Sequence, residues 1–157
     1  MEDNRGVQRP EELKFFLAIF KEALDKSFSL FPTYFVNNTD DFVDELAVLT
    51  KAGLKSLKPW ATLSDITGPV VDNILIRRFI EIAPKSSIKI CDLFHSEFLW
   101  KIERLIFLRS GGKEEHLYFS FPEGFLASSP LMDNIPILNR SGWICEGRSH
   151  GFLIPMG

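Results

Sequence analysis

Residues Phe98–Phe121 read FLWKIERLIFLRSGGKEEHLYFSF, two apolar, aromatic-rich runs separated by the turn Ser110–Lys113. A Gly-Gly pair between two such runs predicts a β-hairpin. In the second run, from Leu117 to Phe121, every second residue is large and apolar, which is the period of a strand with one buried face. The beginning of the first run, residues 98–104, also satisfies a helical period, but we prefer a strand from Leu99 onward. A hairpin of this size is marginally stable alone, so we expect it to pack against the segments that precede it.

The first of these segments, residues 10–28, has the features of an amphipathic helix. Pro10 suits the first helical position, and Glu11 and Glu12 place negative charge at the positive end of the helix dipole. Apolar residues then recur at intervals of three and four. They are Leu13, Phe16, Leu17, Phe20 and Leu24.

Two further segments, 39–58 and 69–82, also have helical spacing. The first is preceded by residues that can cap a helix and carries its acidic residues early, as the helix dipole favours. The second begins after Pro69 and ends before Pro84. Residues 74–82 are rich in β-branched side chains, so a strand is the alternative there.

Helices followed by strands are typical of an α+β fold. We therefore expect an N-terminal three-helix layer packed on a C-terminal antiparallel sheet built around the 99–121 hairpin. Residues 1–9 should form a flexible lead-in, and residues 10–157 one globular domain. Three prolines within residues 122–140 predict a surface excursion. The other strands that we expect are 87–93, 143–146 and 152–154.

Composition limits the classes of function. The chain has 157 residues, 45% of them hydrophobic and 25% charged, which is typical of a folded soluble protein. Its net charge of −3 argues against a nucleic-acid binder, whose phosphate contacts require a basic surface. No apolar run approaches the roughly 20 residues of a membrane span, and the N-terminus lacks an apolar signal region. We expect a cytoplasmic protein that binds neither nucleic acid nor membrane.

A cysteine- and histidine-dependent enzyme is one possible function. Cys145 and His150 could form a nucleophile and its base in a pocket between helices and sheet, with Glu146 or Asp92 orienting the imidazole. A spacing of five residues is no signature of a thiol enzyme, and a cysteine beside Trp143 and Ile144 is more often a small apolar core residue. This enzyme is therefore the alternative hypothesis.

The sequence gives no support for a metal or another cofactor. Cys91 and His95 have a spacing that two metal ligands could use, but a structural zinc site needs four ligands, and no second close pair exists. A nucleophile elbow and a phosphate-binding loop are both absent. We expect no cofactor and no metal.

The leading hypothesis is a small acidic protein that acts by protein–protein binding, such as an inhibitor or an immunity-type protein that neutralises a more basic partner. Four acids within six residues can attract a basic partner. Tryptophans are enriched in binding hot spots, and the one after Pro59 is the best candidate for exposure. A carrier of small molecules lined by phenylalanine is a third possibility. The residues expected to bind the partner are Asp40, Asp41, Asp44, Glu45 and Trp60.

Overall fold

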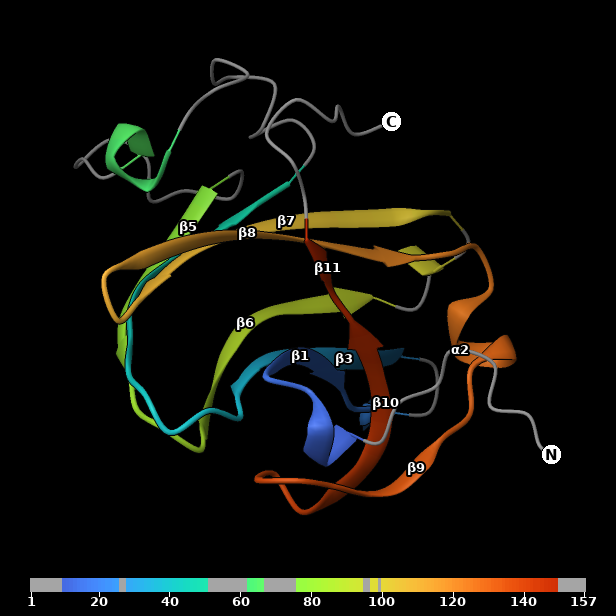
Figure 1. The fold of residues 1–157 in the computed structure, drawn as a ribbon. Helices are drawn as coiled ribbons and strands as arrows, with labels where there is room; N and C mark the ends of the chain where they lie inside the picture. The colour runs from blue at the N-terminus through green and yellow to red at the C-terminus, as the bar shows by residue number, and fades with distance from the viewer. Residues whose placement is uncertain are drawn as a thin grey trace, which may run out of the picture.

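The chain forms two antiparallel β-sheets packed face to face in a computed structural model that describes residues 10–25, 28–50, 62–66, 76–94, 97–98 and 100–149 (Figure 1). Sheet A contains β1 (Phe15–Ile19), β2 (Glu22–Asp25), β3 (Phe28–Asn37), β6 (Ser86–Phe94), β9 (Met132–Ile135) and β10 (Arg140–Glu146). Sheet B contains β4 (Val43–Leu49), β5 (Ile76–Ile82), β7 (Ile102–Ser110), β8 (Lys113–Phe121) and β11 (Arg148–Ser149). The other elements are η1 (Pro10–Glu12), η2 (Leu63–Ile66) and α2 (Phe125–Ser128).

In sheet A, β1 and β2 follow one another along the same edge of β3. Phe15 pairs with Asn37 and Glu22 with Leu30 in one continuous register, so β1 and β2 are two parts of one hairpin arm. β6 pairs with the other edge of β3, and β10 joins β1 to β9. In sheet B the order is β11-β8-β7-β4-β5.

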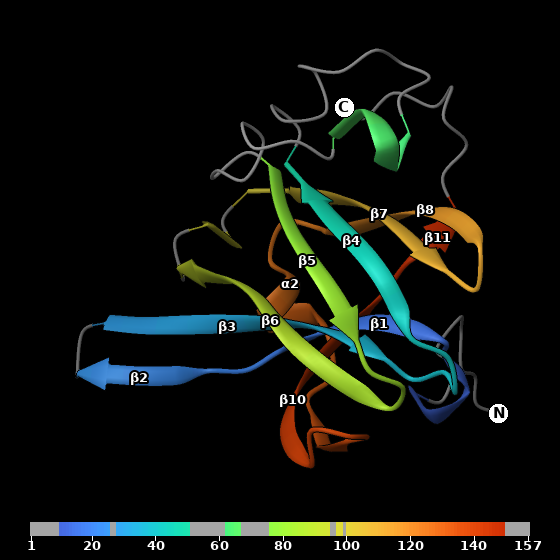
Figure 2. The same ribbon diagram turned by 90° about the vertical axis from the view of Figure 1, so that its left-hand side faces the viewer.

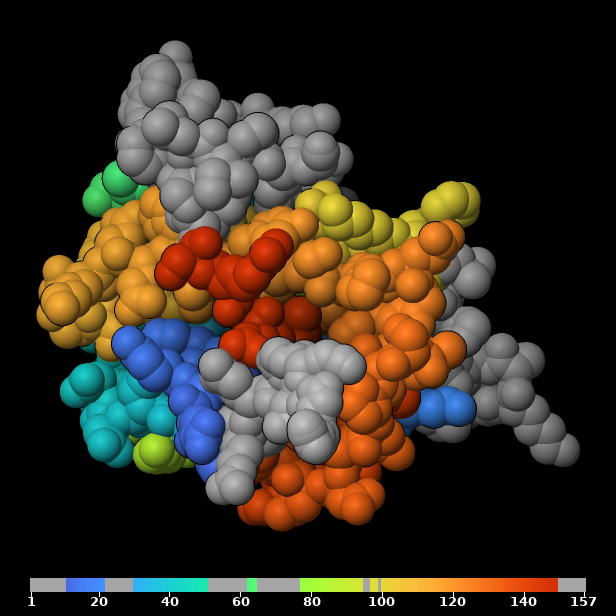
Figure 3. Space-filling model, turned by 45° about the vertical axis from the view of Figure 1, so that its right-hand side comes forward, coloured from blue at the N-terminus to red at the C-terminus, as the bar shows by residue number. Residues whose placement is uncertain are grey.

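Five connections carry the chain between the sheets, namely β3–β4, β5–β6, β6–β7, β8–β9 and β10–β11. The β3–β4 turn and the β5–β6 turn lie at the same end of the molecule, and Figure 2 shows β5 and β6 diverging from their turn into different sheets. The β10–β11 connection is the single residue Gly147. A Cβ atom at Gly147 would lie 2.6 Å from the buried Phe119 ring, so a larger residue here requires the ring or the backbone to shift. Figure 3 shows β10 and β11 between the N-terminal strands and the β7–β8 hairpin.

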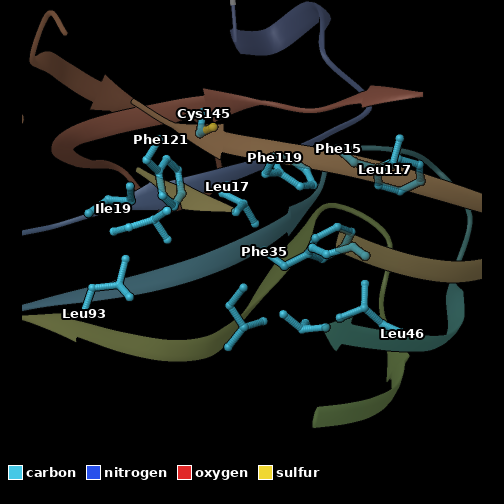
Figure 4. Close-up of a cluster of buried hydrophobic side chains, with 14 of the residues drawn as sticks. Phe15, Leu17, Ile19, Phe35, Leu46, Leu93, Leu117, Phe119, Phe121 and Cys145 are labelled. Carbon is cyan, nitrogen blue, oxygen red and sulfur yellow. The ribbon is translucent and has the colours of Figure 1, made fainter. Parts of the chain in front are cut away.

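The core between the sheets is built from large apolar side chains. Figure 4 shows Leu17 and Phe35 of sheet A and Phe119 and Phe121 of sheet B pointing toward one another. Each of these four side chains is at most 1% exposed. Phe98 and Phe125 close one end of this core, with their rings stacked at 6.4 Å. Burial on this scale supplies the main favourable term in folding.

Both sheets also bury part of their outer face. The β9–β10 hairpin packs Ile135 against Phe16 and Phe20 on the outside of sheet A. On the outside of sheet B, Leu63 of η2 packs against Leu105 and Phe107. Strands in these regions are therefore apolar on two sides rather than one.

The prediction of an α+β fold with a three-helix layer is wrong, because the described residues are mainly strands and contain a single short α-helix, α2. Residues 10–28 form η1, β1, β2 and the start of β3, with 26–27 outside the described residues. Residues 39–50 form a turn and β4. Residues 76–82 form β5, so the strand alternative given for residues 74–82 is correct for these positions. Residues 51–58 and 69–75 lie outside the described residues.

Double-sided burial explains the error. All five residues of β1 are buried, so this strand reads as a continuous apolar run whose period is ambiguous. In β4, Leu46 and Val48 face the inter-sheet core while Ala47 and Leu49 face η2. Neither strand shows the alternation that identified β8.

The predicted central hairpin is confirmed, although its first strand, β7, begins at Ile102 and not at the expected Leu99. β7 pairs with β8 from Ile102↔Phe121 to Ser110↔Lys113, across the Gly111-Gly112 turn. The predicted strands 87–93 and 143–146 are β6 and β10. The predicted surface excursion at 122–140 instead contains α2 and β9, and the predicted strand 152–154 lies outside the described residues.

Candidate protein-binding surface

The β3–β4 turn is fixed by one buried amide. Asn37 is completely buried, and its Nδ2 donates to the carbonyl oxygens of Asp41 at 2.8 Å, Ala83 at 3.0 Å and Ile82 at 3.3 Å. Its Oδ1 accepts hydrogen bonds from the backbone N–H and the hydroxyl of Thr39, at 3.1 and 2.7 Å. This side chain therefore holds the β3–β4 turn against the β5–β6 turn.

Further hydrogen bonds bring three connections together. The backbone N–H of Lys85 donates to the Thr39 carbonyl at 3.1 Å, and Lys85 Nζ donates to the Asn38 carbonyl at 3.0 Å. The hydroxyl of Ser110, at the end of β7, donates to the Phe42 carbonyl at 2.6 Å. The β3–β4 turn, the β5–β6 turn and the tip of the β7–β8 hairpin thus meet at one end of the molecule (Figure 1).

Three of the predicted partner-binding acids lie on the surface at this end. Asp40 and Asp41 are exposed in the β3–β4 turn, and Asp44 is exposed in β4. The helix-dipole explanation for their clustering is wrong, because they lie in a turn and a strand. Asparagine, threonine and aspartate at residues 37–41 instead supply side chains that bond to nearby backbone groups in tight turns.

Glu45, the fourth predicted acid, has a different role. Its carboxylate pairs with Arg109 of β7 and with Arg78 of β5, the latter at 3.4 Å. Because two guanidinium groups already compensate it, Glu45 adds little negative charge for a partner. Trp60, the last predicted partner-binding residue, lies outside the described residues.

The structure adds two apolar side chains that the sequence analysis missed. Phe42 is 52% exposed beside the acidic turn, and Ile80 of β5 is 59% exposed. Phe42 immediately precedes β4, and Ile80 lies on its neighbour β5, since Val43 pairs with Ile82 and Glu45 with Ile80. The sequence could have indicated the exposure of Ile80 if residues 76–82 had been assigned as a strand, because alternation then places Ile80 on the same face as the charged Arg78.

A fourth surface carboxylate completes the group. Glu81 lies in β5 between Ile80 and Ile82, the partners of Glu45 and Val43, and like Asp44 it is exposed. We use the name acidic corner for Asp40, Asp41, Phe42, Asp44, Ile80 and Glu81.

A second polar group lies on the outer face of sheet B. Glu114 Oε2 accepts a hydrogen bond from the backbone N–H of Leu63 at 2.8 Å and lies 2.8 Å from His116 Nε2. The imidazole of His116 stacks on the Phe107 ring with centroids 3.7 Å apart. Glu114 also lies 3.9 Å from Arg109, which pairs with Glu45 as well. Arg109 therefore links the two carboxylates, and Glu114 attaches η2 to the sheet through the Leu63 N–H.

Cys145, the nucleophile of the alternative enzyme hypothesis, lies in the inter-sheet core. This residue is 6% exposed in the inter-sheet core, and its Sγ donates to the Ser120 carbonyl at 3.5 Å. Burial raises the pKa of the Cys145 thiol to about 12, the opposite of what a nucleophilic cysteine needs. Glu146 is exposed and, as the next residue in β10, points to the other face of the strand. His150 lies outside the described residues.

Of the two residues whose spacing metal ligands could use, Cys91 and His95, the structure describes only Cys91. Burial raises the pKa of the half-buried Cys91 thiol, and His95 lies outside the described residues. Within the described ranges, no three side chains of histidine, cysteine, aspartate or glutamate are grouped so that they could hold a metal ion.

Comparison of the chain with protein-family models, with curated proteins and with solved structures found no match. None of the helices in the described part of the chain has the length and apolar character that crossing a membrane requires.

Proposed function

We propose that the protein binds a more basic partner protein through the acidic corner and acts by blocking that partner, as an inhibitor or an immunity-type protein does. The observation that carries this proposal is the exposure of Phe42, at 52%, just before β4, and of Ile80, at 59%, on the neighbouring strand β5, among exposed carboxylates. Large apolar side chains gathered within a polar rim are typical of protein interfaces.

The charges of the corner favour a basic partner. Asp40, Asp41, Asp44 and Glu81 contribute four negative charges, whereas the nearby lysines are Lys85 and Lys113. Lys85 Nζ is engaged by the carbonyl and side-chain oxygens of Asn38. A positive group on a partner would be attracted to these carboxylates and would accelerate encounter at low ionic strength.

The corner is also well suited to tight binding because its backbone is already ordered. Asn37 satisfies three carbonyl groups of the two turns, and Ser110 holds the Phe42 carbonyl. A surface that does not need to reorganise loses less conformational entropy on association. The two free thiols, Cys91 and Cys145, suit a reducing compartment, and we propose the cytoplasm as the location.

Site-specific photo-crosslinking tests the proposal. In one protein a photo-reactive phenylalanine analogue replaces Phe42. In the control protein the same analogue replaces Leu131, which lies just before β9 and is 57% exposed. We expect the analogue at position 42, and not at position 131, to capture a basic protein from cells that produce this chain. Absence of an adduct specific to position 42 contradicts the proposal.

The captured protein then allows a quantitative test. Phe42→Ser and Ile80→Ser should each weaken its binding at least tenfold, because exposed apolar residues at the centre of an interface are the usual hot spots. Asp41→Lys with Asp44→Lys should slow association and reduce its dependence on salt. The matched control Leu131→Ser should leave the dissociation constant unchanged. Equal affinity for wild type and all corner variants would exclude the acidic corner as the binding surface.

A further inference from the structure

Strand β5 lies at one edge of sheet B. The strand order is β11-β8-β7-β4-β5, so β4 is the one strand in the described part of the chain that pairs with β5. Figure 2 shows β6 turning away from β5 into sheet A. We use the name β5 edge for the side of β5 away from β4. In an antiparallel pair, alternate residues direct their N–H and carbonyl groups toward the partner strand, and the residues between them direct theirs away.

The β7–β8 hairpin shows which residues of each strand bond to which neighbour. Gly111 and Gly112, with φ of 60° and 80°, form a two-residue turn closed by the pair Ser110↔Lys113. The closing pair of such a turn exchanges both backbone hydrogen bonds, so Ser110 and every second residue before it bond to β8. The residues between them, of which Phe107 is one, therefore bond to β4 on the other side of β7.

The same alternation continues across β4. Phe107 pairs with Ala47, so Ala47 bonds to β7. The next residue of β4, Val48, therefore bonds to β5, where its partner is Arg77. Every second residue of β5, counted from Arg77, bonds to β4 in this way. The residues whose N–H and carbonyl groups lie on the β5 edge are Ile76, Arg78 and Ile80.

The side chains beside this edge leave room for another strand. Ile80 is 59% exposed, and Arg78, on the same face, pairs with Glu45 at 3.4 Å. Glu81 has a φ of 54°, which interrupts the extended conformation of β5 directly after Ile80. Outward-facing backbone groups beside an exposed apolar side chain can pair with another strand.

The sequence of β5 is complementary to itself when two copies run antiparallel. A register centred on Phe79 places Arg78 of one copy opposite Ile80 of the other. Both residues direct their backbone groups to the β5 edge, so each such pair can exchange two hydrogen bonds. The same register brings Arg77 next to Glu81 of the other copy, and both side chains are exposed. Opposite charges at such positions stabilise a strand pair.

The two neighbouring registers are less favourable. A register centred on Arg78 would oppose the two arginines, and like charges at opposing positions are destabilising. A register centred on Ile80 would require hydrogen bonds from residues beyond Glu81, where the extended conformation is interrupted. Charge and backbone conformation therefore favour the register centred on Phe79.

We propose that β5 pairs with β5 of a second copy of this chain, so that the two copies of sheet B form one continuous antiparallel sheet. Each copy contributes the same edge, so a two-fold axis closes the assembly at two copies. The dimer does not depend on the partner proposed for the acidic corner. Ile80 belongs to both surfaces, whereas Phe42 and the carboxylates of the β3–β4 turn lie outside the strand pairing.

Sedimentation of the intact chain tests the dimer. Between about 10 μM and about 1 mM protein, we expect the mass to rise from that of one 18.0 kDa chain toward that of two. Hydrogen exchange over the same range locates the contact. The amides of Arg78 and Ile80 should exchange at least fivefold more slowly at the highest concentration, whereas the Phe79 amide, which is bonded to β4, should not change. A monomer at the highest concentration, or slowing that spares Arg78 and Ile80, overturns the proposal.

Two substitutions of one exposed residue test the register. Ile80→Lys should raise the dissociation constant of the dimer at least tenfold, because the lysine lies opposite Arg78 of the second copy. Ile80→Glu should lower it, because a carboxylate there lies opposite the same guanidinium. Amide spectra at low concentration check that both variants are folded.

Trp100→Ser is the matched control, because Trp100 is 71% exposed and lies outside β5. It should leave the dissociation constant of the dimer unchanged. Equal dissociation constants for Ile80→Lys and Ile80→Glu, or a loss in Trp100→Ser as large as in Ile80→Lys, also overturn the proposal.

Discussion

Asn37 Nδ2 lies 3.0 Å from the carbonyl oxygen of Ala83, a residue 46 positions further along the chain. This contact joins the β3–β4 and β5–β6 turns, at both of which the chain passes between the sheets. Replacing Asn37 by alanine would leave the carbonyls of Asp41, Ile82 and Ala83 without their donor in a buried setting. We expect Asn37→Ala to lower the free energy of unfolding by about 2–3 kcal/mol, measured by chemical denaturation.

The matched control is Asn134→Ala, because Asn134 is exposed in β9. It should change the free energy of unfolding by less than about 0.5 kcal/mol. If the two alanine variants are equally stable, Asn37 does not hold the turns together.

Gly142 lies against the backbone of a neighbouring strand. A Cβ atom there would lie 2.5 Å from the Ile19 carbonyl oxygen and 2.7 Å from the Phe20 ring. We expect Gly142→Ala to destabilise the protein by about 2–3 kcal/mol, because strand β10 must shift to relieve the overlap. Gly124→Ala, where φ is 75° but the added Cβ meets nothing within 4 Å, should cost about 1 kcal/mol. Thermal or chemical denaturation compares the two, and an equal loss would show that crowding at Gly142 is relieved without strain.

The sequence predicted those strands whose two faces differ in environment. In β8, Leu117, Phe119 and Phe121 face the core while the residues between them are half-buried, so the period of two is visible. β1 and β4 are covered on both faces, by the β9–β10 hairpin and by η2, and their apolar runs fit a helix equally well. The covering elements come from distant parts of the chain, so local periodicity could not reveal them.

Only the part of the candidate surface that depends on local sequence could be predicted. Asp40, Asp41 and Asp44 were identified from charge density, which needs no structure. Ile80 joins them only through the register of β4 with β5, and Glu45 is compensated only through Arg78 and Arg109. Contacts made across a sheet depend on pairing, and one sequence contains no direct record of pairing.

Glu114 fastens η2 to sheet B through the backbone N–H of Leu63, at 2.8 Å. We expect Glu114→Ala to increase the hydrogen-exchange rate of the Leu63 amide at least tenfold, because that donor loses its acceptor. Amides in the middle of β7 should keep their protection. Glu115→Ala, at the next position of β8, is the control and should leave the Leu63 amide unchanged. Slow exchange of the Leu63 amide in Glu114→Ala would mean that other contacts hold η2.

The buried thiol of Cys145 should make stability depend on pH in alkaline solution. Unfolded cysteine ionises near pH 8.5, at about its ordinary pKa, whereas burial raises the pKa of folded Cys145 to about 12. Between these values the unfolded state has lost its proton and the folded state has not, so the free energy of unfolding decreases as pH rises. This group alone contributes a slope of up to about 1.4 kcal/mol per pH unit. Denaturation at several pH values from 8 to 11 should therefore show a steeper decline for wild type than for Cys145→Ala. Parallel declines, or rapid alkylation of native Cys145 by iodoacetamide near neutral pH, would mean that solvent reaches the thiol in the folded protein.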